Sequence, residues 1–130
     1  MNVLDENILE SQRQLLRGWR IAIRQIGQEL GHKGMKDEDE VIPFLLTLHR
    51  PTLFTRDLGL YDSSLCHARY CVVTLAVGQY EAAYFVRRLL SHREFDEQAK
   101  RMGTVIRAMQ TGLAVWRLRS DRELRLPWSD

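Results

Sequence analysis

The stretch Thr52-Leu-Phe-Thr-Arg-Asp57 decides how this chain is organised. Its apolar pair Leu53-Phe54 predicts a short strand, and Thr55 and Asp57 follow at the carboxyl end of that strand. Ligands of open α/β sheets bind just beyond the carboxyl ends of the strands. Two other acids are expected at the same edge: Asp5, after the first apolar run, and Asp39, at the start of a helix.

Strands and helices are expected to alternate outward from this stretch. Apolar patterns predict further strands at residues 1–4, 20–24, 70–77, 104–109 and 113–118, and helices at 8–18, 41–48, 79–90 and 93–102. The segment 58–68 is expected to be loop and turn, and the nearly continuous apolar run at 70–77 predicts a strand buried on both faces. The order predicts an α/β fold with a mainly parallel sheet and a closing antiparallel hairpin. We expect a single domain over 1–130, with a core at 1–118 and a loosely held tail at 119–130.

Length and composition are those of an ordinary globular domain. The chain has 130 residues, enough to bury a core, and 45% of them are hydrophobic. No apolar run approaches the roughly 20 residues of a membrane span. The N-terminus has no signal-peptide pattern, so a cytoplasmic location without membrane attachment is expected.

Charge is distributed unevenly along the chain. Residues 1–81 carry 9 basic and 11 acidic side chains, whereas residues 82–130 carry 10 basic and 6 acidic ones. An acidic first part beside a basic second part suits a metal centre served by a phosphate-attracting surface. A normal solvated surface explains the same numbers equally well.

The three acids Asp5, Asp39 and Asp57 are the first candidates for chemistry. Hard cations such as Mg²⁺ and Mn²⁺ prefer carboxylate oxygens and keep several waters. Such an ion activates water and stabilises charge on a phosphoryl group. Each acid also has an ordinary structural role, and Asp39 in particular is a natural helix N-cap.

Other sites are weaker. Cys66 and Cys71 are separated by four residues and lack the paired spacing and four ligands of a zinc site, so Cys71 is expected to be a buried, inert side chain. The glycines at 27, 31 and 34 match neither a dinucleotide fingerprint nor a P-loop. Arg56, Lys33 and Lys36 are candidates for contacts with nucleic-acid phosphates.

Four short motifs now give a resemblance. They are Asp5-Glu6-Asn7, Gly31-His32, the acidic run 37–40 and Thr55-Arg56-Asp57. In this order and spacing they resemble the PIN-like nucleases, specifically the small proteins of the DUF5615 type that are related to VapC toxins. The resemblance covers roughly residues 1 to 90 and implies a three-layer α/β/α fold of PIN-like type.

The resemblance also implies a set of site residues. Asp5 and Asp57 correspond to metal-binding acids, and Thr55 to a hydroxyl that supports the site. For the acid before the second helix Asp39 is favoured, with Asp37 second. The family often has another acid two residues after the last aspartate, where this chain has Gly59; Asp62 is the residue that would compensate.

The activity that the resemblance implies is metal-dependent ribonuclease, commonly as the toxin half of a toxin–antitoxin pair. RNA would be hydrolysed by water activated at Mg²⁺ or Mn²⁺, with RNA and a small antitoxin protein as partners and homodimer formation left open. The alternative is a non-catalytic PIN-like module that binds RNA or a protein, and Gly59 favours that alternative.

Overall fold

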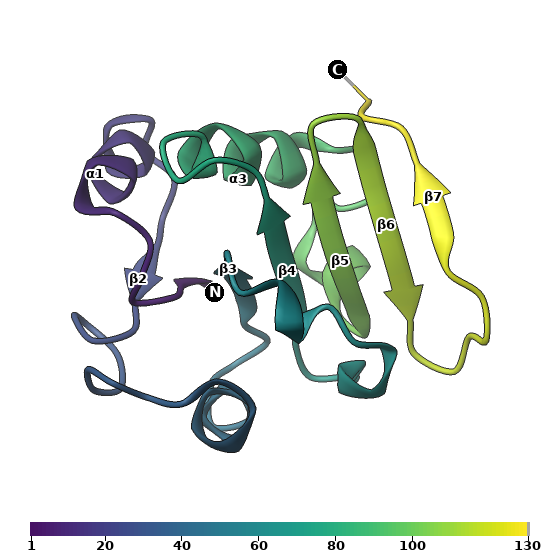
Figure 1. The fold of residues 1–130 in the computed structure, drawn as a ribbon, viewed down its shortest axis with the longest axis horizontal. Coiled ribbons are helices and arrows are strands. Elements are labelled where there is room, and N and C mark those ends of the chain that lie inside the picture. The colour runs from purple at the N-terminus through teal and green to yellow at the C-terminus, as the bar shows by residue number, and fades with distance from the viewer. Residues whose placement is uncertain (130) are drawn as a thin grey trace.

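The computed structural model describes the backbone of residues 1–129 and their side chains, except the side chain of Asp37. Figure 1 shows the arrangement of the elements. The strands are β1 (Asn2–Leu4), β2 (Arg24–Gln25), β3 (Thr52–Thr55), β4 (Cys71–Ala76), β5 (Thr104–Met109), β6 (Gly112–Arg117) and β7 (Leu124–Leu126). The α-helices are α1 (Glu10–Gly18), α2 (Ile42–Leu45), α3 (Ala82–Ser91) and α4 (Gln98–Arg101). A π-helical turn, η1 (Asp37–Val41), and two 3₁₀ turns, η2 (Leu58–Leu60) and η3 (Ser63–Leu65), complete the list.

All seven strands join in one sheet of order β2-β1-β3-β4-β5-β6-β7. The first five strands in that order are parallel, while β5 with β6 and β6 with β7 pair antiparallel. The β5–β6 hairpin turns between Met109 and Gly112. The predicted α/β fold, with a mainly parallel sheet and an antiparallel hairpin after it, is confirmed.

Two apolar clusters cover the two faces of the sheet. On one face Leu16 of α1 and Phe85 of α3 pack with Phe54 and Val73. On the other face Leu45 of α2 and the segment that holds η2 and η3 pack with Leu53, Val72 and Val105. Side chains of successive strand residues point to opposite faces, which is why neighbours such as Leu53 and Phe54 belong to different clusters.

Strand β4 is the centre of the sheet, as expected. It lies between β3 and β5, with Val72 facing one cluster and Val73 the other. Within the run 70–77, the exposed fractions of Val72, Val73 and Leu75 in β4 are 0, 0 and 1%, and that of Val77, just after the strand, is 9%. The apolar run identified this strand because a strand covered on both faces has no solvent-facing positions.

The prediction of a strand at 20–24 is wrong for most of that segment. Only Arg24 and Gln25 pair with β1, and Arg20 has a positive φ of 61°. A residue in this left-handed conformation ends the turn after α1 and cannot continue an extended strand. The alternation of Ile21 and Ile23 belongs to a connecting segment that packs on the core.

Two helical predictions are also corrected. The segment 93–102 holds only the four-residue α4, because the buried Arg101 side chain binds the Phe95 carbonyl (2.7 Å) and the Thr52 hydroxyl (3.0 Å) and shapes the chain around itself. Asp39 is not an N-cap: it lies inside the π-helical turn, where Glu40 and Val41 both donate to the Lys36 carbonyl, and α2 begins after Val41 without a side-chain cap.

The tail expected to be loosely held instead adds the seventh strand. Leu124 to Leu126 pair with β6, and the Tyr61 hydroxyl donates to Glu123 at 2.6 Å. Trp128 donates from Nε1 to the Met109 carbonyl at 2.8 Å, and its ring packs at a tilt against the Phe85 ring. The described part of the tail is therefore held by pairing with β6, by packing of Leu126 and Trp128 on the cluster that contains Phe85, and by these hydrogen bonds.

None of the helices within residues 1–129 is both long and apolar enough to cross a membrane.

The burial of β4 leads to a stability prediction. Val73→Asp should leave the domain unfolded at 25 °C, because an unpaired carboxylate at a fully buried position costs several kcal/mol. Leu124→Asp is the matched control, since Leu124 is 39% exposed on the edge strand β7 and should tolerate the charge. Circular dichroism during urea titration measures both; a cooperative transition for Val73→Asp like that of wild type would contradict the central position of β4.

Candidate active site

The candidate site lies where the order of the sheet reverses. From β1 the chain moves to β2 on one side, then crosses back to β3 on the other side of β1. The connections that leave β1 and β3 therefore diverge, with α1 on one face and η2 on the other. In doubly wound sheets of order 2-1-3-4-5 this switch point is the crevice that receives ligands. Asp5 and the Thr55–Asp57 segment stand at its two sides.

Thr55 joins these two sides through hydrogen bonds. Its hydroxyl donates to Asp5 Oδ2 at 3.2 Å and accepts from the Asp57 backbone amide at 3.0 Å. Thr55 is buried, with 1% of its surface exposed, so water has little access to its hydroxyl and does not readily replace either partner. One hydroxyl thus fixes the positions of two acids that are 52 residues apart in the sequence.

Asp57 is oriented by the turn that follows it. Its Oδ1 accepts from the Gly59 amide at 2.9 Å, and it caps η2. A Cβ atom on Gly59 would come within 3.1 Å of the same oxygen, which is tighter than ordinary contact. Gly59 is therefore packed against the Asp57 carboxylate, which would have to shift slightly to make room for a side chain at this position.

Asp5 carries an unfavourable charge. Burial is the largest effect that raises the pKa of its carboxyl, and the negative charges of Glu6 and Asp57 raise it further. Hydrogen bonds from Thr55 and from the Glu6 amide oppose this shift without cancelling it. A partly buried carboxylate repelled by a second one nearby is an arrangement that a bound cation would stabilise.

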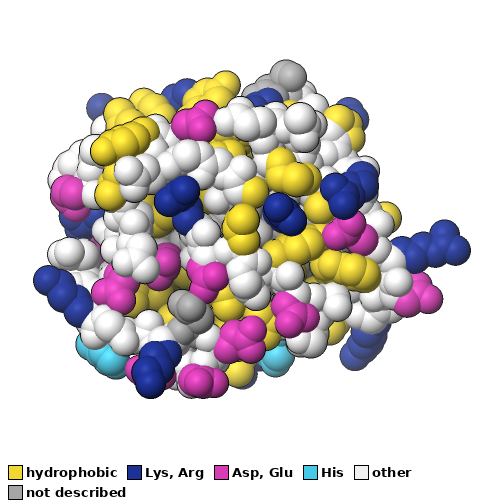
Figure 2. Space-filling model, in the orientation of Figure 1, with side chains coloured by type: hydrophobic (Ala, Val, Ile, Leu, Met, Phe, Trp, Pro, Cys, Tyr) yellow, Lys and Arg dark blue, Asp and Glu magenta, His cyan; other side chains and the backbone are white. Residues whose placement is uncertain are grey.

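The third acid does not join this pair in the structure. Among the described side chains, no three or more His, Cys, Asp or Glu residues lie close enough together to hold a metal ion. Asp39 is exposed in η1, and Asp37 lies outside the described side chains. Asp62 accepts from the amide and the hydroxyl of Ser64 at 2.9 and 2.8 Å and caps η3, which is a structural role. Figure 2 shows acidic side chains gathered across the lower half of one face of the molecule.

The three candidate basic residues lie in two segments: Arg56 is within the Thr55–Asp57 motif, and Lys33 and Lys36 are in a separate loop. Arg56 stands between Thr55 and Asp57, and its Nε donates to the Val77 carbonyl at 3.1 Å, which directs the guanidinium toward the end of β4. Lys33 and Lys36 are exposed in the segment 27–36. That segment is attached to the site by Glu6, whose two carboxylate oxygens accept from the Gly34 amide at 2.9 and 3.1 Å.

Glu6 and Gln25 are parts of the site that the sequence did not reveal. Gln25 is buried in β2, and its Nε2 lies 3.0 Å from the Asp5 carbonyl and 2.9 Å from the Ile8 carbonyl. These bonds hold the turn that carries Asp5 and Glu6 at the end of β1. A single glutamine after an irregular segment has no sequence signal of this kind, because its partners are backbone atoms about twenty residues away.

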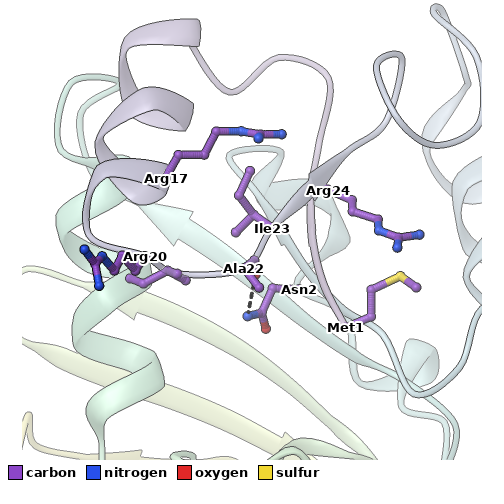
Figure 3. A pocket seen from close by; sticks show the side chains of 8 residues that line it. Met1, Asn2, Arg17, Arg20, Ala22, Ile23 and Arg24 are labelled. Atoms are coloured by element: carbon purple, nitrogen blue, oxygen red, sulfur yellow. Dashed lines mark hydrogen bonds between the residues drawn. The ribbon is translucent and has the colours of Figure 1, made fainter.

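A separate pocket of about 410 Å³ lies at the amino end of β1, opposite the acids (Figure 3). Arg17, Arg20 and Arg24 line it, but Arg20 and Arg24 extend in opposite directions from the segment 20–24. Arg17 makes an ion pair with Glu29, and the Asn2 amide donates to the Ala22 carbonyl at 3.1 Å. The cationic groups do not converge, so this pocket has no built anion site.

The cysteines behave as expected from their spacing. Cys71 is fully buried in β4, its Sγ lies 3.2 Å from the Thr104 hydroxyl, and burial raises the pKa of its thiol to about 12. Cys66 is half-buried, and its Sγ lies 3.5 Å from the Trp116 carbonyl. Neither is placed as a reactive thiolate.

No family model, curated protein or solved structure significantly matches this chain.

The support given by Gln25 is testable through stability. Gln25→Leu keeps the volume but removes the donor from the Asp5 and Ile8 carbonyls, and should lower the free energy of unfolding by about 2 kcal/mol, since each buried polar group left unpaired costs roughly 1–3 kcal/mol. Gln28→Leu is the control, because Gln28 is exposed. Urea denaturation compares the two; equal stabilities would show that Gln25 does not hold the turn.

The electrostatics of Asp5 predict a pH dependence. Its pKa is raised in the folded state, so the folded protein binds this proton more tightly than the unfolded chain, and the ionised group destabilises the fold near neutral pH. Metal-free Asp5→Asn should therefore gain stability over wild type at pH 7, and the gain should shrink as pH falls toward 4. Asp96→Asn should behave with the opposite sign at pH 7, because a hydrogen bond from Lys100 lowers the pKa of Asp96. Thermal melting in EDTA decides it; an Asp5→Asn effect that grows on acidification would contradict the assignment.

Proposed function

We propose that this chain is a metal-dependent ribonuclease of PIN-like type, with a cytoplasmic location. The observation that carries the proposal is the hydrogen-bonded set of Asp5, Thr55 and Asp57 at the switch point of the sheet. These residues belong to the two motifs, Asp5-Glu6-Asn7 and Thr55-Arg56-Asp57, on which the resemblance to PIN-like proteins depends. A three-layer PIN-like architecture is part of the same proposal.

The donor set fits a hard divalent cation. Mg²⁺ is commonly held by one or two carboxylates together with waters and substrate phosphates, and does not need a complete cage of protein ligands. Asp5 and Asp57 supply two carboxylates, and the pKa of the Asp5 carboxyl is raised, chiefly by burial and further by the charges of Glu6 and Asp57. Asp39 is the proposed third acid, with Asp37 as the second choice, although the structure does not gather Asp39 with Asp5 and Asp57.

The residues of the chain have distinct roles in this proposal. The Asp5 and Asp57 carboxylates hold Mg²⁺ or Mn²⁺, and Thr55 keeps Asp5 Oδ2 and the Asp57 backbone in register. The ion, when bound, supplies an activated water and positive charge for the hydrolysis of an RNA phosphodiester. Glu6 fastens the segment that carries Lys33 and Lys36, which makes these lysines candidates for contacts with RNA phosphates.

A toxin of a toxin–antitoxin pair is the biological setting that the resemblance favours. Its partner would be a small antitoxin protein that covers the site. The second candidate is a PIN-like module that binds RNA or a protein without cleaving it, and Gly59 supports this alternative because it stands where the family often has a further acid. The close packing of Gly59 against Asp57 explains a glycine at this position without loss of catalysis. We therefore keep the ribonuclease as the first choice.

The metal assignment predicts how Asp57→Asn behaves. The amide oxygen can still accept from Gly59, so the variant should melt at or above the wild-type temperature without metal, because repulsion from Asp5 is removed. Wild type should gain about 2.7 kcal/mol of stability at Mn²⁺ of 100 times its Kd, whereas Asp57→Asn should gain almost none and should cleave no single-stranded RNA.

Three comparisons make this experiment decisive. Asp96→Asn, a change of the same charge far from the site, should keep both Mn²⁺ stabilisation and cleavage. Asp39→Asn tests the third acid and should weaken both. Wild type that ignores Mn²⁺ would refute the metal site, while wild type that binds Mn²⁺ and leaves RNA intact would select the non-catalytic module.

A further inference from the structure

A second cavity lies on the same edge of the sheet as the acids, next to the switch point. It has a volume of about 490 Å³ and is formed at the carboxyl ends of β3, β4 and β5, whose parallel pairing brings these ends together. Figure 1 shows the arrowheads of β4 and β5 at the same end of the sheet. We call this cavity the basic shelf; its lining side chains include Arg56, Leu58, Arg107 and Gln110, with residues 75–78 as its floor.

Two guanidinium groups face the basic shelf. Arg56 is exposed and is held there by the bond from its Nε to the Val77 carbonyl. Arg107 comes from β5, and its Nε is buried without a hydrogen-bond partner. The charge of Arg107 also acts on Glu123, but that carboxylate already accepts from the Tyr61 hydroxyl at 2.6 Å and pairs with Arg125 at 2.9 Å. Arg107 thus places a second arginine on the wall of this open cavity, which adds to the attraction of the shelf for phosphate groups.

Apolar and aromatic surface adjoins these charges. Leu58 is 42% exposed on the wall of the shelf, and Tyr80 is 71% exposed two residues after Gly78. The loop that carries Tyr80 is held in place: Glu81 accepts from the Gly78 amide at 3.0 Å and from Gln110 Nε2 at 2.7 Å. Proteins that bind single-stranded nucleic acids stack bases on exposed aromatic rings and hold phosphates with cations. Tyr80, two residues after a residue that lines the shelf, and the shelf arginines supply these two kinds of group.

The shelf is continuous with the candidate active site along the chain, since Arg56 separates Thr55 from Asp57. Strands in a sheet are about 4.8 Å apart, so the row of carboxyl ends from β1 to β5 spans roughly 14 Å. That length suits a few nucleotides laid along the edge. We propose that the basic shelf is the substrate-binding groove for single-stranded RNA, with Arg56 and Arg107 on phosphates and Tyr80 against a base. This inference rests on the proposed ribonuclease function and names its substrate class and binding residues.

The test measures RNA binding separately from metal binding. Fluorescence anisotropy with a labelled single-stranded RNA of about ten nucleotides, in EDTA, gives affinity without cleavage. The double variant Arg56→Gln/Arg107→Gln should bind more weakly and should lower the slope of log K against log salt by about 1.4, since each phosphate contact on a single strand contributes roughly 0.7. Tyr80→Ala should weaken binding at least about fivefold with an unchanged salt slope.

The matched control is Arg93→Gln/Arg122→Gln, which removes the same charge from two exposed arginines outside the shelf and should keep the wild-type slope. Two further variants guard against misfolding. Arg56→Gln alone should lose part of the slope of log K against log salt. The charge-preserving double variant Arg56→Lys/Arg107→Lys should retain most of the affinity for RNA. Every shelf variant keeps Asp5 and Asp57 and should therefore retain stabilisation by Mn²⁺, which distinguishes failure of the groove from failure of the metal site.

Two outcomes would overturn the inference. Shelf variants that bind RNA with the affinity and salt slope of the control would place the RNA elsewhere, whether or not wild type binds Mn²⁺. Wild type that binds duplex RNA of the same length as tightly as the single strand, with no effect of Tyr80→Ala, would show that no base is stacked on this surface.

Discussion

The parallel pairing of β1 with β3 is the constraint on which the site depends. It sets residues about fifty positions apart side by side, in the register Asn2 to Thr52 and Leu4 to Phe54, and it is extended by the bond from the Asp5 amide to the Phe54 carbonyl at 2.9 Å. Only with this register does the Thr55 hydroxyl reach the Asp5 carboxylate. Both strands are short and fully covered by apolar side chains, so packing on the two faces, together with the ladder bonds, holds the acids in place.

The regular parts of the fold were predictable, because their cause is local. Burial of one or both faces produces a periodic pattern of apolar residues in the sequence. This pattern is clear in β3, β4 and β5 as apolar runs, and in α1 and α3 as helical spacing. The predictions for 20–24 and 93–102 were wrong because remote contacts override local periodicity there. Arg20 adopts a left-handed turn, and Arg101 turns inward to Thr52 and Phe95. The pairing of the tail with β6 depends on partners that no periodicity in the tail itself indicates.

The candidate site likewise contains residues that the sequence pattern predicted and residues that it did not. Asp5, Thr55 and Asp57 follow apolar runs, so a rule about the ends of parallel strands was enough to bring them together. Gln25 contributes through bonds to backbone atoms about twenty residues away, and such bonds are not visible in a one-dimensional pattern. Asp39 belongs to an acidic run whose local conformation is a π-helical turn; a sequence reading favours an ordinary cap there because π turns are rare.

The two outer strands of the sheet restrict how copies of this protein can associate. Strand β2 has two residues and β7 has three, and both carry an exposed arginine, Arg24 and Arg125. Short, charged edges offer little backbone for a second chain to extend the sheet, and they protect against edge-to-edge aggregation. Contacts between copies are therefore directed away from the sheet edges and toward helix surfaces and loops.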